Sequence, residues 1–441
     1  MRNISVVILA AGAGTRMKSP TPKVLHRLAG REMIDFAIRA ALSVSSDVRV
    51  VLFHEFDLIA AHIGAEFGES GEFGGRVRCV RQDHLRFPGT GGAAMAGIEG
   101  DCGDRIVVLN GDMPLITPEF VKILSEKEEA IAISVFELED PSGYGRVIIR
   151  ENRVEKIVEE KDASEAEKSV NIVNAGVYSF SREFLTSFLP QLQNNNAQKE
   201  YYITDLIAIA AANGIPIGAV KGDRATLMGI NSKSDLANAE KIYEDNLKKQ
   251  LMNSGVIMRM PETIFIDDRA VFEGECILEN GVVISGACKI KNSHIKTYSV
   301  IEESVIIESD IGPMAHIRPQ SQIVKTHIGN FVETKNAKLN GVKAGHLSYL
   351  GDAEIGENTN IGAGTITCNY DGKKKHKTTI GKDVFIGSDT QLVAPVTIPD
   401  NVIIGAGTTV TKSCESGDLV LSRTEQKNIA GFFARFFGKT C

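Results

Sequence analysis

Aliphatic residues recur at every sixth position through the second half of the chain. The repeat runs from Ile380 to Val410 without interruption and, earlier, from Ile266 to Ile290. Neither the 3.6-residue period of a helix nor the two-residue period of a strand produces a repeat of six. Hexapeptide repeats are typical of parallel β-helices, so the pattern predicts such a solenoid over about 260–411. Shorter runs keep the interval with small shifts of phase; these are Ile295–Ile301–Ile307, Ile311–Ile317–Ile323 and Ile355–Ile361.

Each hexad is expected to supply one short strand and one corner of the coil. The aliphatic side chain then points inward and stacks on the next coil at about the 4.8 Å spacing of paired strands. Several of these side chains are followed by a glycine, which is expected at a corner where a Cβ would crowd the backbone. These glycines are Gly356, Gly362, Gly381, Gly387 and Gly405.

Two segments near the C-terminus depart from the six-residue repeat. Residues Thr367 to Thr379 fall outside it, and insertions in a solenoid project on one face, which is often the binding face. The stretch Asn428–Gly438 contains four phenylalanines and predicts a short amphipathic helix. We expect this helix to cap the solenoid or to pack on a neighbouring molecule, in preference to contacting a membrane.

The first half of the chain alternates short apolar runs with helical periodicity. This alternation predicts an α/β domain with a mostly parallel sheet, whose ligands bind at the carboxyl ends of the strands. Apolar positions over 234–252 predict a helix joining the two halves, with Ser234 as its N-cap. The predicted strands are Ile4–Ala10, Val48–Phe53, Ile106–Leu109, Ile131–Phe136 and Val173–Phe180, and the predicted helices lie near 31–43, 118–128 and 204–213. We therefore divide the chain into a domain at 1–230, a linker helix at 231–255 and a β-helix domain with a C-terminal tail at 256–441.

Length and composition narrow the class of protein. The chain has 441 residues, 24% charged and 43% hydrophobic, which describes a globular protein of more than one domain. A net charge of −7 argues against a nucleic-acid binder, and no stretch reaches the ~20 apolar residues of a membrane span. Seven cysteines without a CxxC pair indicate reduced thiols and a cytoplasmic protein. The apolar run Ile4–Ala11 is expected to be a buried strand, because the Gly12–Arg16 segment makes a poor signal cleavage site.

A glycine-rich turn follows the first predicted strand. Gly12 and Gly14 let backbone N–H groups approach phosphates, although the turn matches neither a P-loop nor the dinucleotide fingerprint and alone indicates only a tight turn. Arg16 and Lys23 follow closely, and two cations there can neutralise charge on a transferring phosphoryl group. Asp112 ends another buried strand and is either a ligand for phosphate-bridging Mg²⁺ or an acidic turn residue.

Motifs along nearly the whole chain resemble those of the sugar-1-phosphate nucleotidyltransferases. They are LAAGAGTRM, PKVLH, GTGGAAM, GDMP, GYGR, VEEKDA, NNNAQKEYYITD and GIN. Within that superfamily the set is most similar to a bacterial family of bifunctional enzymes, N-acetylglucosamine-1-phosphate uridyltransferase and glucosamine-1-phosphate N-acetyltransferase. These enzymes make UDP-N-acetylglucosamine, a precursor of peptidoglycan and lipopolysaccharide, and GYGR and EYYITD are specific to them.

For the first half, the resemblance implies uridylyl transfer from UTP to N-acetylglucosamine-1-phosphate by in-line attack, with Mg²⁺ and without a protein nucleophile. Arg16 and Lys23 would face the triphosphate, and Asp112 and Asn231 would bind Mg²⁺. Gly145, Glu159 and Asn174 would hold the sugar; the remaining nucleotide or product contacts are Leu9, Ala10, Ala11, Gly12, Lys23, Gln82, Gly89, Thr90, Asn110 and Gly111. The chain departs from the family at Asn110, where Tyr is common, and in the longer interval from Gln82 to Gly89.

A histidine among small residues interrupts the apolar repeat at position 346. Acetylation of an amine needs a general base near neutral pKa, although a lone histidine is more often structural. The resemblance implies that His346 is this base, in acetyl transfer from acetyl-CoA to glucosamine-1-phosphate. It assigns the sugar phosphate to Arg318, Lys335, Tyr349, Asn360 and Lys375, and acetyl-CoA to Asn369, Tyr370, Ser388, Ala406 and Arg423.

The family also implies a left-handed coil and a homotrimer whose acetyl sites draw on neighbouring subunits. Two alternatives remain open at this point. One is a nucleotidyltransferase whose β-helix serves only as a trimerisation scaffold. The other is a non-catalytic binding or regulatory subunit. The polar residues around His346 speak against the scaffold, and the set of Arg16, Lys23, Asp112 and Asn231 speaks against the non-catalytic subunit.

Overall fold

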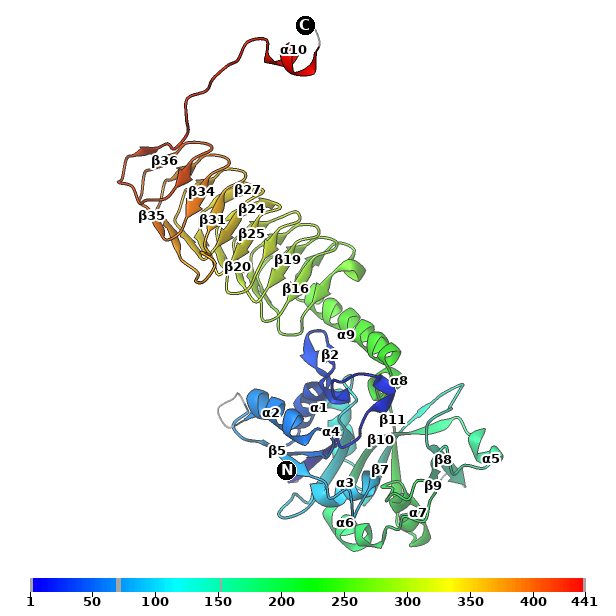
Figure 1. The fold of residues 1–441 in the computed structure, drawn as a ribbon. Helices are drawn as coiled ribbons and strands as arrows, with labels where there is room; N and C mark the ends of the chain where they lie inside the picture. Colours follow the sequence, from blue (N-terminus) through cyan, green and yellow to red (C-terminus); the bar gives the residue numbers. More distant parts are fainter. Residues whose placement is uncertain (1–2, 69–72, 151–152, 439–441) are drawn as a thin grey trace. The chain divides into compact units, whose positions relative to one another are not determined.

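The chain folds into two compact units, Met1–Tyr243 and Glu244–Cys441 (Figure 1). This computed structural model describes residues 3–68, 73–150 and 153–438. The division falls inside helix α9 (Lys233–Asn253), which lies where a helix between the two halves is predicted. The expected N-cap, Ser234, is wrong, because the helix begins before it. Ser232 occupies that position: its Oγ accepts from the Asp235 N–H, and the Asp235 carboxylate accepts from the Ser232 N–H.

The N-terminal unit contains a mixed sheet in the order β11-β7-β10-β6-β1-β4-β5. β10 (Ile172–Ser181) runs antiparallel to its two neighbours and the other pairs along this path are parallel, which confirms a mostly parallel sheet. The hairpin β8–β9 (Arg146–Arg150, Arg153–Val158) extends it beside β10. The other strands are β1 (Ile4–Leu9), β4 (Asp47–Leu52), β5 (Val77–Arg81), β6 (Arg105–Asn110), β7 (Ile131–Glu137) and β11 (Ile217–Lys221).

Helices cover both faces of this sheet (Figure 1). Alternate residues of β1 enter two different cores: Val6 and Ile8 pack with α1, α2 and α4, whereas Val7 packs with α3, α6 and α7. The first apolar run is therefore a buried central strand, as predicted. The helices are α1 (Met33–Leu42), α2 (Phe56–Phe67), α3 (Gly89–Gly97), α4 (Pro118–Ser125), α6 (Arg182–Phe188) and α7 (Asp205–Ala212).

The C-terminal unit is a parallel β-helix with three sheets. Strands of two to four residues follow the chain around the coil, and nearly every strand pairs in parallel with the third strand after it. We call the sheets the first, second and third faces. They run from β12 (Ile257–Met258) to β38 (Leu419–Val420), from β13 (Phe265–Ile266) to β37 (Thr409–Val410), and from β14 (Val271–Glu273) to β35 (Val396–Ile398).

The six-residue repeat marks the interior of the coil. Ile380, Ile386 and Leu392 are buried and lie opposite Ile398, Ile404 and Val410 of the following coil. The phase expected at Ile307 is wrong: Ile306 is the buried residue, because some sides of the coil advance by five residues instead of six.

The predicted glycine corners are confirmed by their surroundings. A Cβ added at any of them would lie under 3.0 Å from an atom of the next coil. At Gly362, for example, it would be 2.5 Å from the Ser388 nitrogen. These five positions are Gly356, Gly362, Gly381, Gly387 and Gly405.

The loop that leaves the coil is shorter than the sequence predicts. Thr367 is a buried inward position of β31 (Ile366–Cys368) and faces Leu392, and β32 (Thr378–Ile380) resumes the coil. Only 369–377 leave it, because threonine as well as isoleucine fills inward positions here. Asp371 orders this loop by accepting from the backbone of Lys373 and Lys374, and these bonds help to lower the pKa of its carboxyl to about 2.

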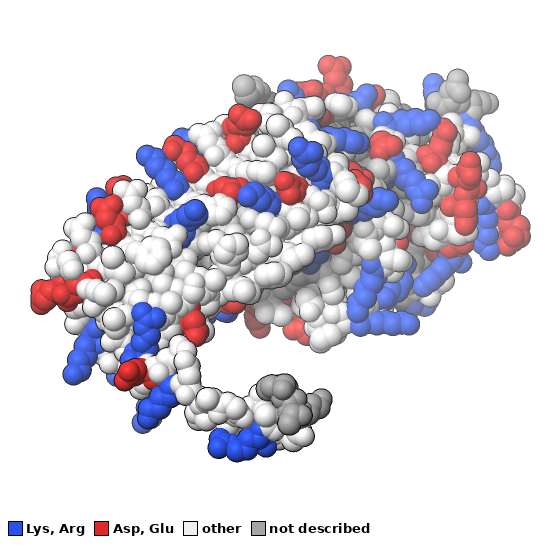
Figure 2. Space-filling model, turned by 90° about the horizontal axis from the view of Figure 1, so that it is seen from above, with Lys and Arg blue, Asp and Glu red and all other residues white. Residues whose placement is uncertain are grey.

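The C-terminal tail ends in α10 (Phe432–Phe437), inside the predicted helix. Its four phenylalanines are exposed, so the expectation that the helix caps its own coil is wrong, and packing on a neighbouring molecule stays a prediction. Acidic and basic side chains are interspersed over the face seen in Figure 2. Across residues 3–68, 73–150 and 153–438, no helix has the length and apolar character needed to cross a bilayer.

Candidate active sites

Four predicted site residues from distant segments meet at the carboxyl end of β6. The Lys23 ammonium donates to the Asp112 carboxylate at 2.5 Å and to the Asn231 amide oxygen at 3.0 Å. The Arg16 guanidinium donates to the same Asn231 oxygen at 2.7 Å. The fold keeps the side-chain oxygens of Asp112 and Asn231 close together, because the N–H of the neighbouring Ile230 donates to the Asp112 carbonyl. We call these four residues the N-terminal charge cluster.

The oxygens of this cluster fit a Mg²⁺ ion. The Asp112 carboxylate and the Asn231 amide oxygen point at one place, and the Lys23 ammonium lies between them and donates to both. Mg²⁺ prefers such hard oxygen donors and usually takes only one or two of them from the protein.

The glycine-rich turn lies beside this cluster. Gly14 has a left-handed φ of 60°, and a Cβ there would collide with the Lys23 side chain, so only glycine lets Lys23 pack so closely. Gly12 has open space around it, since an added Cβ would meet no atom within 4 Å. The Ala10 N–H donates to the Val51 carbonyl, whereas Ala11 and Gly12 are partly or fully exposed. The turn therefore leaves room for a phosphate next to two cations.

The longer interval after β5 folds back on itself and leaves Gln82 buried. The Gln82 side-chain nitrogen donates to the carbonyls of Phe87 and Gly89, so this amide holds the loop closed. The extra residues form a turn that projects Leu85 into solvent. Gly89 and the Thr90 hydroxyl pack on the EYYITD segment, where Thr90 Oγ1 accepts from the Ile203 N–H at 3.0 Å.

The three predicted sugar residues also lie together. The Asn174 N–H donates to the Gly145 carbonyl at 2.8 Å, and a Cβ at Gly145 would lie 3.4 Å from the Glu159 carboxyl. Burial raises the pKa of Glu159, and the nearby Asp205 and Asp162 raise it further, whereas the bond from Thr204 opposes the shift. Asn110 reaches the same region, since its amide donates to the carbonyl of Gly176, which lies at the irregularity in the middle of β10 between Asn174 and Tyr178.

Sequence reasoning missed two residues that position the sugar set. Thr204 donates to the Glu159 carboxyl at 3.1 Å, and the Asn174 amide donates to the buried Tyr178 hydroxyl at 2.5 Å. Thr204 lies inside the EYYITD motif, which was a usable signal. Tyr178 lies on a strand and carried none.

In the β-helix, His346 shares one corner with residues predicted to bind acetyl-CoA. Backbone bonds from Gly364 to Leu347, from Asp389 to Ala363 and from Gly407 to Ser388 connect this corner in successive coils. His346, Ser388 and Ala406 directly precede Leu347, Asp389 and Gly407, which turn this corner with positive φ in three of the coils, so the three residues form one column. The Arg423 guanidinium lies near Gly405 at its end. The His346 ring is exposed and makes no hydrogen bond or ion pair with the described residues.

The cations predicted to bind the sugar phosphate gather at a different corner. Lys335 lies beside Lys375 and near Arg318, and these positive neighbours lower the pKa of its ammonium. Arg318 also pairs with Glu333 at 2.8 Å. Asn369 starts the projecting loop and donates to Asp352 at 2.5 Å and to the Tyr349 hydroxyl at 3.4 Å. Three cations that repel one another favour an anionic ligand between them.

The two groups of acetyl-site residues lie at opposite edges of the second face. Leu347, next to His346, donates its N–H to the Asn330 carbonyl at the edge where the strands of that face begin. At the opposite edge, where these strands end, the Asp352 N–H donates to the Lys335 carbonyl. Tyr349 lies between them on β28 (Tyr349–Gly351). Asn360 belongs to the first face, and Tyr370 is exposed on the loop. One chain thus carries the two groups of predicted acetyl-site residues at opposite edges of the same face.

Comparison with known proteins agrees with this division of chemistry. Residues 6–170 match the family described as MobA-like NTP transferase domain, and residues 377–412 match the bacterial transferase hexapeptide with six repeats. A protein of Wolinella succinogenes named bifunctional protein GlmU is 56% identical over 438 residues, which cover 99% of this chain and 100% of that protein. The proteins of that name from Campylobacter concisus and Helicobacter hepaticus are 56% and 51% identical, each over 99% of this chain and 98% of the relative.

Proposed function

The chain belongs to the bifunctional GlmU family, and from this premise we propose that it makes UDP-N-acetylglucosamine in two successive transfers. The β-helix transfers acetyl from acetyl-CoA to glucosamine-1-phosphate. The N-terminal unit then transfers UMP from UTP to N-acetylglucosamine-1-phosphate and releases pyrophosphate. The product supplies peptidoglycan and lipopolysaccharide synthesis.

In the uridylyl transfer, a phosphate oxygen of the sugar attacks the α-phosphorus of UTP while the bond to pyrophosphate breaks. Arg16 and Lys23 offset the charge that develops on the phosphates, which is the main catalytic requirement of such a reaction. Asp112 and Asn231 would hold Mg²⁺, which neutralises phosphate charge when bound. Glu159 and Asn174 orient the sugar, with Gly145 leaving space for it.

In the acetyl transfer, the sugar's amine nitrogen attacks the thioester carbon, the carbon–sulfur bond breaks and CoA leaves as its thiolate. His346 takes a proton from the amine. An exposed ring without a partner among the described residues is free to do so. Arg318, Lys335 and Lys375 hold the sugar phosphate, and Ser388, Ala406 and Arg423 line the corner along which the cofactor binds.

The separation of the acetyl-site residues supports a homotrimer in which adjacent chains complete each site. Hexapeptide coils packed side by side bring one chain's His346 corner towards a neighbour's cation corner. Within the described residues the six cysteines are free, which supports a cytoplasmic location.

The convergence of Arg16, Lys23, Asp112 and Asn231 on one point carries the proposal. Its test is mass spectrometry of the products formed from glucosamine-1-phosphate, acetyl-CoA, UTP and Mg²⁺. UDP-N-acetylglucosamine with free CoA is the expected result. Conversion of added N-acetylglucosamine-1-phosphate alone would leave the β-helix as a scaffold and overturn the role of His346.

A further inference from the structure

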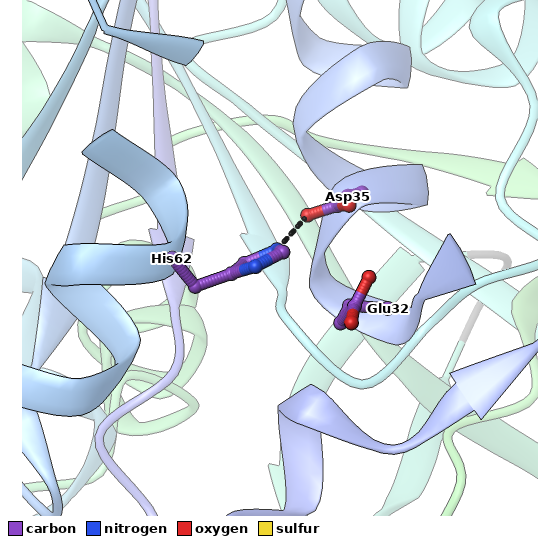
Figure 3. Close-up of side chains that lie close together, drawn as sticks. All are labelled: Glu32, Asp35 and His62. Atoms are coloured by element: carbon purple, nitrogen blue, oxygen red, sulfur yellow. Dashed lines mark hydrogen bonds and ion pairs between the residues drawn. The ribbon is translucent and has the colours of Figure 1, made fainter. Parts of the chain in front are cut away.

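A second group of metal-ligating side chains lies between α1 and α2, apart from the N-terminal charge cluster. Glu32 is the N-cap of α1, Asp35 lies in its first turn, and His62 projects from the facing helix α2 (Figure 3). His62 Nε2 is 2.8 Å from Asp35 Oδ1. Apolar residues of both helices share one core, which fixes the distance between the helices.

The Asp35 carboxyl has one oxygen that the protein does not satisfy. Its side chain is 1% exposed, and Oδ2 has no hydrogen-bond partner within the described part of the chain. A buried carboxylate oxygen without a partner is costly and in native proteins usually indicates an absent ion or water. The single bond to His62 accounts for Oδ1 only.

The surroundings carry an excess of negative charge. Glu32 lies beside Asp35, and Glu66, one turn beyond His62 on α2, acts on both Asp35 and His62. Arg27 bonds one Glu32 oxygen at 2.9 Å but is 66% exposed. Three carboxyl groups therefore lie close enough to act electrostatically on one imidazole, and a divalent cation would balance them.

We infer that Glu32, Asp35 and His62 form a binding site for a divalent transition-metal cation such as Zn²⁺. One ligand atom from each residue lies within 4.8 Å of the other two. Tetrahedral ligands at ~2.1 Å from zinc lie roughly 3.4 Å apart, so small rotations of the partly exposed Glu32 and His62 complete the geometry. A water molecule takes the fourth position.

The imidazole distinguishes this site from the one at Asp112. Imidazole nitrogen is a ligand of zinc and related metals, whereas Mg²⁺ prefers oxygen donors alone. The ion would join α2 to the hairpin β2–β3 (Arg27–Leu28, Arg31–Glu32), which precedes α1. It therefore stabilises the fold of the N-terminal unit and takes no part in either transfer.

The test is equilibrium dialysis of the full chain against Zn²⁺ in excess Mg²⁺, with bound zinc measured by elemental mass spectrometry. The excess Mg²⁺ keeps the oxygen-donor site at Asp112 occupied. The wild type should bind one more zinc per chain than His62→Gln, and the affinity at this site should fall roughly 100-fold. His54→Gln, an exposed histidine of the same unit, is the matched control and should bind zinc as the wild type does.

A thermal scan gives a second readout. Zinc should raise the Tm of the wild type and of His54→Gln, and should raise that of His62→Gln less. Glu32→Gln tests the third ligand with little risk to folding, even where Asp35→Asn fails to fold. Equal zinc content in the wild type and His62→Gln would overturn the site and leave a His–Asp pair that only ties two helices together. Neither result bears on the two transfer reactions.

Discussion

At the scale of single residues, Glu159 predicts a specific pH dependence of stability. Burial raises its pKa in the folded unit. A carboxyl whose folded pKa exceeds its unfolded one binds its proton more tightly when folded. Its contribution to the free energy of unfolding is therefore largest below the ordinary carboxyl pKa and is lost as pH rises through the raised value. Urea unfolding across this range should show a smaller decline in Glu159→Gln than in the wild type, because burial also raises the pKa of Asp205, which the variant keeps.

The adjacent Glu160 supplies a control of opposite sign. Its bond with Arg146 lowers the pKa of this partly exposed carboxyl. Any stability that it contributes is lost as pH falls through the lowered value, so Glu160→Gln should alter the acid end of the profile and leave the upper window unchanged. An identical upper window in Glu159→Gln and the wild type would contradict the assignment to Glu159.

The role of a residue could be predicted from the sequence when the residues that it contacts also belong to recognised motifs. Arg16, Lys23, Asp112 and Asn231 belong to recognised motifs, and the structure brings them together. The support that Gln82 gives to its own loop could not be predicted, because this bond depends on how the extra residues fold. His62 was missed as well, since its partners lie on another helix and single carboxylates are common on helices.

At the scale of elements, the glycine corners set a packing limit between coils. A Cβ at Gly362 would lie 2.5–2.7 Å from three backbone atoms of the next coil, which cannot rotate away. Gly362→Ala should therefore destabilise the β-helix by about 1–3 kcal/mol, the usual cost of overpacking. Chemical unfolding followed by circular dichroism measures this difference.

Gly345→Ala, at the equivalent place in the preceding coil, is the matched control. An added Cβ there would meet no atom within 4 Å, so its unfolding midpoint should stay within experimental error of the wild type. If both alanine variants unfold at the same denaturant concentration, crowding at the corner is not what selects glycine.

The inward repeat was the most predictable feature of the fold, because each coil repeats one physical requirement. The predicted inward position was wrong where one side of the coil has five residues instead of six, as between Ile301 and Ile306. The predicted start of the loop at Thr367 was wrong, because an inward threonine interrupts the aliphatic pattern without interrupting the coil. Short-range polarity cannot distinguish a loop from a coil position whose hydroxyl finds a backbone acceptor, as Thr367 does with Gly351.

At the scale of the whole molecule, the two reactions should be separable by single substitutions. Asp112→Asn removes the carboxylate of the N-terminal charge cluster and should lower uridylyl transfer by roughly 10²–10³-fold, while acetyl transfer continues. His346→Ala should have the reverse effect. Separate assays of CoA release and pyrophosphate release on each variant measure this, and loss of both activities in either variant would argue against independent sites.

The arrangement of the β-helix predicts that chains can complement one another. His346 and Lys335 lie at opposite edges of the second face, so we expect a site that uses both to combine adjacent chains. His346→Ala and Lys335→Ala chains are each expected to be inactive in acetyl transfer. After co-assembly at equal amounts, random assortment leaves both side chains intact in about one quarter of the sites.

CoA release by the mixed trimers should therefore recover to about one quarter of the wild-type rate, since intact sites act independently. The double variant carrying both substitutions is the control, and it should recover nothing when mixed with either single variant beyond what that variant provides. Native mass spectrometry verifies that mixed assemblies have formed. If verified mixtures stay inactive, both residues serve a site within one chain, and the loop of 369–377 rather than a neighbour must bridge the face between them.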